Sequence, residues 1–231
     1  MRLGRPQRWE RDPRAGWLAA FGIAFAVGFA VVAGLLASPV ANPVDAAVSA
    51  WIRYFRYPAL TSIALALTLL ASAYVVIPAT VIASAWLGFT GRMRAAMYVL
   101  FSVVPGWLVA SVLKLVFHRE RPQGVSLVPM PADFSLPSGH TVAAALLYGS
   151  LAVVVVFNLD SSAARRTAVT LASVLVTGVA LSRVYLGVHW VGDVLAALLF
   201  AAAWLSFTTI AYLGSIVEQR RAGATAEPLD R

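Results

Sequence analysis

Cysteine is absent from this 231-residue chain, and charged residues make up only 12% of it. The absence of thiols excludes disulfide bridges, cysteine metal ligands and any enzyme mechanism that uses a thiolate nucleophile. Soluble domains carry about 25% charged residues, so the low charge content argues against a water-soluble protein.

Hydrophobic residues are abundant instead: they form 60% of the chain, and its mean hydropathy is +0.80. This is enough for roughly six membrane spans of about 20 residues each, which leaves no room for a separate soluble domain. We therefore predict an all-α fold, a bundle of six transmembrane helices.

The charge is strongly basic, with a formal net charge of +8 and Lys114 as the one lysine among 18 basic residues. In a membrane protein such an excess reports the orientation of the loops. We expect the lipid bilayer, and no nucleic acid, as the partner of this surface.

Uncharged runs between polar segments give the six expected spans, and a mixed segment of Trp, Tyr, Arg and Asp at 42–57 is typical of the headgroup layer. An interfacial helix is therefore expected between spans 1 and 2. The spans are expected at 16–39, 71–89, 95–117, 138–157, 167–185 and 191–213.

This pattern divides the chain into a basic tail at 1–15, a six-helix membrane domain at 16–215 and a polar, frayed C-terminal tail at 216–231. The first run could instead be a cleaved signal peptide. Its length exceeds the usual 7 to 15 apolar residues of such signals, which favours a retained span.

Basic residues gather on one side of the predicted bundle, in both tails and in the loops at 92–94 and 165–166, which together hold 12 of the 18. The positive-inside rule makes that side cytoplasmic. We expect an integral, multi-pass protein of the cell (inner) membrane with both termini in the cytoplasm. The loops at 40–70, 118–137 and 186–190 then lie outside.

The unusual polar residues all fall near the outer ends of the spans, where ionisable groups are costly and are functional candidates. His189 and Asp193 stand four residues apart, so a carboxylate could fix the tautomer of an imidazole and leave its second nitrogen free. A buried polar pair at a helix start explains the same spacing.

Ser138, Gly139 and His140 follow Pro137 at the expected start of the fourth span, where free backbone N–H groups favour anions. Gly139 would let a ligand approach the backbone. Taken alone, Ser138 is better explained as an ordinary helix cap than as a ligand.

Three cations, Lys114, Arg121 and Arg183, could join this helix start in an anion site of phosphate size. Each could instead extend outward to lipid phosphate. For Arg119, outward extension or a pair with Glu120 is favoured over contact with a second phosphate, and Asp133 has no assigned role.

Three segments carry a family resemblance: KLVFHRERP at 114–122, PSGH at 137–140 and SRVYLGVHWVGD at 182–193. They resemble the type 2 phosphatidic acid phosphatase superfamily, whose patterns are K-x6-R-P, P-S-G-H and S-R-x5-H-x3-D. Every fixed position is matched, and the family's six-helix membrane core fits the expected spans.

The resemblance implies a metal-independent phosphatase or diphosphatase without a cofactor, working through a phosphohistidine. In it His189 would attack phosphorus, Asp193 would orient His189, and His140 would protonate the leaving oxygen and then activate water. The phosphate oxygens would be held by Lys114, Arg121, Ser138, Gly139 and Arg183.

A membrane lipid phosphate is the expected substrate, entering laterally at the outer face, and residues 51–57 could line its entrance. Undecaprenyl diphosphate and a glycerolipid phosphate, either phosphatidate or phosphatidylglycerophosphate, both remain open. A six-helix transporter or channel for an anionic lipid or phosphate is the alternative. Metal-dependent hydrolysis is disfavoured because no short metal-binding spacing is present.

Overall fold

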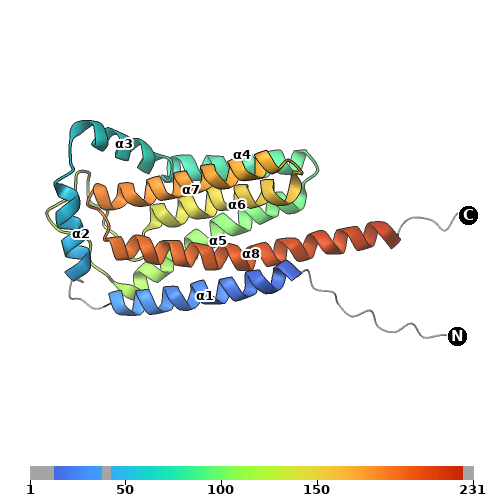
Figure 1. Ribbon diagram of the computed structural model, residues 1–231, viewed down its shortest axis with the longest axis horizontal. Coiled ribbons are helices and arrows are strands. Elements are labelled where there is room, and N and C mark those ends of the chain that lie inside the picture. The colour runs from blue at the N-terminus through green and yellow to red at the C-terminus, as the bar shows by residue number, and fades with distance from the viewer. Residues whose placement is uncertain (1–12, 38–42, 226–231) are drawn as a thin grey trace, which may run out of the picture.

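A computed structural model describes residues 13–37 and 43–225, which form eight helices and no strand (Figure 1). The all-α prediction is therefore confirmed for the described part of the chain. The helices are α1 (Pro13–Leu36), α2 (Pro43–Arg53), α3 (Pro58–Leu69), α4 (Ala73–Phe89), α5 (Met93–Phe117), α6 (Gly139–Asn158), α7 (Ser162–Tyr185) and α8 (Val191–Thr225).

Five of these helices, α1, α5, α6, α7 and α8, are long and apolar enough to cross a membrane. The second expected span, at 71–89, is different: α4 has 17 residues and is about 25 Å long, short of the roughly 30 Å hydrocarbon core. Together with α3, to which it is joined at a bend of 42°, it also meets the requirements for a span. The bundle thus has five unbroken candidate spans and one bent pair.

The expected interfacial helix at 42–57 corresponds to α2, which ends at Arg53. A second helix, α3, begins at Pro58, where proline occupies the first helical turn and its missing N–H costs nothing. Both lie at the end of the bundle opposite the start of α1 and the end of α8 (Figure 1).

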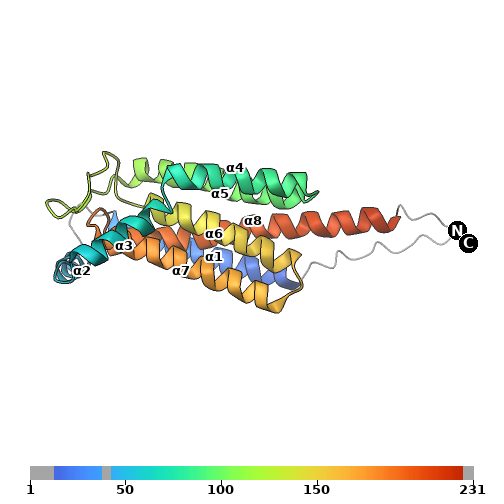
Figure 2. The same ribbon diagram turned by 90° about the horizontal axis from the view of Figure 1, so that it is seen from above.

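The bundle is arranged around α6, whose buried face contacts α5, α7 and α8. In Figure 2, α4 and α5 form a pair on one side, and α1 runs beside α8. Close packing is possible at Gly106 of α5 because a Cβ there would lie 2.6 Å from Leu146 of α6. This arrangement brings the ends of α5 and α7 together with the starts of α6 and α8.

Two expected boundaries differ from the structure. The helix α7 begins at Ser162, where the Ser161 hydroxyl accepts a hydrogen bond from Ala164 N, so Arg165 and Arg166 lie in the helix and not in a loop. The helix α8 continues to Thr225, beyond the expected start of a frayed tail. The outer parts of both predicted tails, 1–12 and 226–231, lie outside the described residues.

Candidate active site

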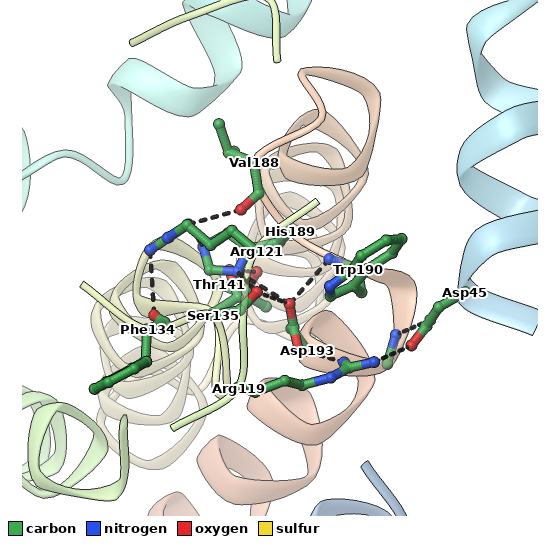
Figure 3. A network of polar contacts seen from close by, with 12 residues as sticks. Asp45, Arg119, Arg121, Phe134, Ser135, Thr141, Val188, His189, Trp190 and Asp193 are labelled. Atoms are coloured by element: carbon green, nitrogen blue, oxygen red, sulfur yellow. Dashed lines mark hydrogen bonds and ion pairs between the residues drawn. The ribbon is translucent and has the colours of Figure 1, made fainter. Parts of the chain in front are cut away.

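The three motif segments converge at one end of the bundle, where residues of the loop at 118–138 lie beside His189 and Asp193 (Figure 3). Backbone hydrogen bonds hold this loop in place: Ser135 N donates to Arg119 O, and Ser138 N donates to Asp193 O. Residues up to 79 positions apart in sequence thus form one polar cluster.

His189 and Asp193 are in contact, as their spacing predicts, with His189 Nδ1 3.4 Å from Asp193 Oδ2. Both side chains are buried. Asp193, the third residue of α8, also accepts a hydrogen bond from Trp190 N at 2.9 Å, which is the role of a helix-start carboxylate. The geometry is therefore compatible with both interpretations of the pair: Asp193 can orient the His189 ring, and it also caps the start of α8.

Ser135 is a member of the cluster that sequence reasoning missed. Its hydroxyl donates to Asp193 Oδ2 and lies 3.4 Å from His189 Nδ1. The serine stands three residues before Ser138 in an irregular loop, and no helical or strand periodicity links it to α8. Its adjacency to the PSGH segment was the available signal.

The imidazole of His189 is held in one tautomer by its surroundings. Nδ1 faces the Asp193 carboxylate, whereas Nε2 lies 3.1 Å from Arg121 Nη1, which donates to it. Burial lowers the pKa of His189 to about 4, against the opposing effect of Asp193, and the charges of Arg121 and Arg183 lower it further. The ring is thus neutral at neutral pH, with its proton on Nδ1.

Lys114 and Arg121 point into the cluster and are buried, so the outward-extended alternative does not apply to them. Both bind Asp133, at 2.6 Å from Lys114 Nζ and 2.7 Å from Arg121 Nη2. Burial would raise the pKa of Asp133, but its hydrogen bond with Lys114 and the two positive charges outweigh this and lower it. The loop carboxylate without an assigned role is therefore the anion that these cations hold.

Arg183, in the last turn of α7, is buried as well. Its Nη1 donates to the Thr68 hydroxyl of α3, and its Nε has no hydrogen-bond partner among the described residues. A buried N–H without a partner is costly, so this one is available to a ligand oxygen.

The start of α6 contributes Ser138, Gly139 and His140. Ser138 is the N-cap, but its side chain makes no capping hydrogen bond; it accepts one from the Thr141 hydroxyl at 3.0 Å instead. Gly139 and His140 line the same cavity as Arg183 and His189. The eight residues expected to form a site are therefore brought to one place.

Two other charged or titratable residues behave differently from expectation. His118 is exposed and ends α5 in a left-handed conformation, with φ 46°, so the cluster contains two of the three histidines. Arg119 neither extends outward nor pairs with Glu120: it is buried and forms ion pairs with Asp193 and Asp45, both at 2.5 Å.

A cavity of about 500 Å³ leads from the polar cluster along the bundle. Its polar end is formed by Lys114, Arg121, Asp133, His140, Arg183 and His189, and the rest is apolar and comes mainly from α4 and α5. Residues 51–57, which could have lined the entrance, are not part of it. Among the described residues, no group of three His, Asp or Glu is placed to hold a metal ion.

Comparison with known proteins agrees with these motifs. The sequence model of the PAP2 superfamily matches residues 95–215. Phosphatidylglycerophosphatase B of Bacillus subtilis is 34% identical over 152 residues, covering 65% of this chain and 74% of that protein. Decaprenylphosphoryl-5-phosphoribose phosphatase of Mycobacterium tuberculosis is 37% identical over 92 residues, covering 37% of this chain and 44% of that protein.

The fold is shared with a solved structure. The crystal structure of the first transmembrane PAP2 type phosphatidylglycerolphosphate phosphatase from Bacillus subtilis has a TM-score of 0.75 and 28% sequence identity, covering 85% of this chain and 96% of that one. The likeness thus extends beyond the motif region to most of the helical bundle.

Proposed function

The chain belongs to the PAP2 superfamily, and on this premise we propose that it is a membrane lipid phosphatase that uses His189 as its nucleophile. One observation carries the proposal: the neutral His189 presents Nε2 to Arg121 at the polar end of a cavity that is otherwise apolar. A phosphate group fits the polar end, and a lipid chain fits the rest.

The first step transfers the phosphoryl group to the enzyme. The negative charge of the bound phosphate favours the protonated form of His140. Nε2 of His189 attacks phosphorus, the bond from phosphorus to the lipid oxygen breaks, and the protonated His140 gives that oxygen its proton. The Asp193 carboxylate accepts the Nδ1–H hydrogen bond and stabilises the positive charge that develops on the ring.

The second step releases phosphate. His140, now neutral, removes a proton from water, the water oxygen attacks phosphorus, and the bond between phosphorus and Nε2 breaks. Inorganic phosphate leaves, and both histidines return to their starting states. The negative charge that builds up on the phosphoryl oxygens requires positioned donors, and no step requires a metal.

The donors for these oxygens are Lys114, Arg121, Arg183, Ser138 and the Gly139 N–H. Arg183 Nε has no other partner among the described residues, and the Ser138 hydroxyl, which accepts one hydrogen bond, still has its own proton to donate. The N–H groups at the start of α6 also lie at the positive end of the helix dipole.

We infer that the substrate is a glycerolipid phosphate, with phosphatidylglycerophosphate as the first candidate. The match to phosphatidylglycerophosphatase B covers 74% of that protein. An isoprenoid substrate such as undecaprenyl diphosphate is the second candidate, since the mycobacterial relative acts on a decaprenyl compound.

The topology proposed for this function has six spans, with α3 and α4 together as the second. The basic tail at 1–15 and the polar tail at 216–231 lie in the cytoplasm, and the membrane domain at 16–215 has its site at the outer face. Support comes from the distribution of basic residues, which leaves the loop at 118–138 on the less basic side.

Phosphate release by the purified protein in detergent tests the proposal, with phosphatidylglycerophosphate, phosphatidate and undecaprenyl diphosphate as substrates and excess chelator present. We expect release that is insensitive to the chelator and fastest with phosphatidylglycerophosphate. Loss of release on chelation would overturn the metal-free mechanism. A folded protein inactive on all three lipids would instead favour the alternative of an anion or lipid transporter.

A further inference from the structure

Arg119 occupies a position that the K-x6-R-P pattern leaves variable, yet its side chain is buried and both of its terminal amino groups are engaged. Nη1 donates to Asp193 Oδ1 at 2.5 Å, and Nη2 donates to Asp45 Oδ2 at 2.5 Å (Figure 3). The guanidinium therefore bridges α8 and the interfacial helix α2.

Asp45 is the second half of this bridge. It is buried on α2, and its Oδ1 accepts a hydrogen bond from Gly192 N at 2.8 Å, one residue before Asp193. A Cβ at position 192 would lie 3.0 Å from Asp45 Oδ2 and 2.7 Å from Leu36, so glycine allows α2 to approach α8 this closely. One carboxylate thus fixes both the arginine and the first turn of α8.

The two carboxylate oxygens of Asp193 have different hydrogen-bond partners. Oδ1 is held by Arg119, whereas Oδ2 receives Ser135, Trp190 N and the His189 ring. The ion pair at Oδ1 restricts rotation of the carboxylate, which favours the orientation in which Oδ2 faces Nδ1 of His189. Arg119 also compensates the charge of a carboxylate that is fully buried.

Arg119 does not line the large cavity, in contrast to Lys114, Arg121 and Arg183. A direct contact with the substrate phosphate therefore does not explain its burial. Its two carboxylate partners do: Asp45, and the Oδ1 atom of Asp193, which is not the oxygen that faces His189.

We propose that Asp45 and Arg119 are positioning residues that act through Asp193 to hold the His189 ring for attack, linking the interfacial helix α2 to catalysis. This inference rests on the proposed function, in which His189 is the nucleophile. Changing Arg119 or Asp45 should therefore lower kcat and leave substrate affinity nearly unchanged.

Four variants test the inference: Arg119→Gln, Arg119→Lys, Asp45→Asn and the double variant Asp45→Asn/Arg119→Gln. The matched control is Glu120→Gln, a change at the exposed neighbour of Arg119. For phosphatidylglycerophosphate in detergent micelles we expect Arg119→Gln to lower kcat by about 10- to 100-fold, the usual cost of removing an outer partner that orients a reactive group. KM should change by less than about threefold, because ground-state binding is untouched.

The other variants separate positioning from folding. Arg119→Lys should recover part of kcat, since an ammonium can reach one carboxylate but cannot bridge two in the planar geometry of a guanidinium. The double variant should be no slower than Arg119→Gln, because Asp45 acts through Arg119. It also removes the carboxylate of Asp45, which Arg119→Gln alone leaves buried without its cation, so it leaves fewer buried charges unpaired than the single variant does.

A spectroscopic readout does not depend on the substrate. In protein with 15N-labelled histidine, the Nδ1–H signal of His189 should weaken or shift in Arg119→Gln and stay unchanged in Glu120→Gln, with exposed His118 as internal reference. Unchanged kcat and an unchanged His189 signal in folded Arg119→Gln would overturn the inference, as would a change confined to KM. An inactive wild type with the expected NMR changes would instead overturn only the proposed function.

Discussion

Arg121 Nη1 lies 3.1 Å from His189 Nε2, so the cation expected to hold the phosphate directly faces the nitrogen expected to attack it. An oxygen of a bound phosphate that accepts from this guanidinium group is thereby brought next to Nε2, with phosphorus one bond further on. The same arginine donates to Val188 O, which fixes it to the backbone that carries His189. Residues 188–189 thus position both the arginine expected to bind the phosphate and the histidine expected to attack it.

The first prediction concerns the nucleophile. His189→Gln is expected to reduce phosphate release from phosphatidylglycerophosphate to background, because the amide cannot form the phosphoenzyme; losses of about 10⁴-fold or more are usual for such residues. Phosphate release and thermal unfolding in detergent should be measured together. A variant that unfolds like the wild type but keeps more than a tenth of its turnover contradicts a phosphohistidine route, and His118→Gln, exposed and outside the cluster, is the control.

The second prediction concerns Asp133, whose carboxylate binds both Lys114 and Arg121 while its side chain is 53% exposed. A substrate phosphate must compete with it for these cations. Asp133→Asn should therefore lower KM and strengthen inhibition by inorganic phosphate, by about two- to fivefold, since an ion pair with an exposed partner is worth up to about 1 kcal/mol.

The control for this change is Asp160→Asn, which removes an exposed carboxylate next to Arg165 at the other end of the bundle. It should leave both constants unchanged. A higher KM in Asp133→Asn would mean that the carboxylate holds the two cations in place for the substrate and does not compete with it.

The third prediction concerns pH and stability. The pKa of His189 is about 4 in the folded protein, against 6.5 as its ordinary value. Between these values the unfolded chain binds a proton that the folded protein does not, so the free energy of unfolding should fall as pH drops from about 6.5 to 4. The lowered pKa of Asp133 acts only below its ordinary value of 3.8 and does not interfere.

Thermal unfolding in detergent at several pH values between 4.5 and 7.5 checks this expectation. The wild type should lose stability towards the acidic end, and His189→Gln, which cannot take up the proton, should lose less. Equal pH dependence in the two proteins would show that the imidazole is not buried in its neutral form.

Sequence reasoning predicted the helices from apolar runs and a candidate site from the three motif segments, whose eight named residues the fold brings together. Apolar runs place the spans, and the spacing of four residues predicts the contact between His189, just before α8, and Asp193 in its first turn. Helix ends were less predictable: α7 begins before Arg165 and Arg166 because the Ser161 hydroxyl caps its first turn by accepting from Ala164 N.

The partners of Arg119 could not be predicted, since they depend on where α2 packs. Asp45 and Arg119 are 74 residues apart and meet only through the tertiary fold. The same holds for Ser135, which reaches Asp193 from an irregular loop. Residues 51–57, which composition suggested for the entrance, do not line the cavity, whose apolar wall is formed by the packing of α4 and α5.

The fourth prediction concerns that apolar wall. Val104 of α5 lines the cavity, and Val112 on the same helix is exposed and does not. Val104→Trp should fill part of the space for the lipid chain and raise KM for a long-chain phosphatidylglycerophosphate by about tenfold, while a dihexanoyl analogue, whose short chains need little of the wall, changes by less than about twofold. Val112→Trp introduces the same side chain at an exposed position of α5 outside the cavity, and it should leave KM for both substrates unchanged. If Val104→Trp impairs the short and long substrates equally, the tryptophan disturbs the polar end itself, and the α4–α5 wall is not where the lipid chain binds.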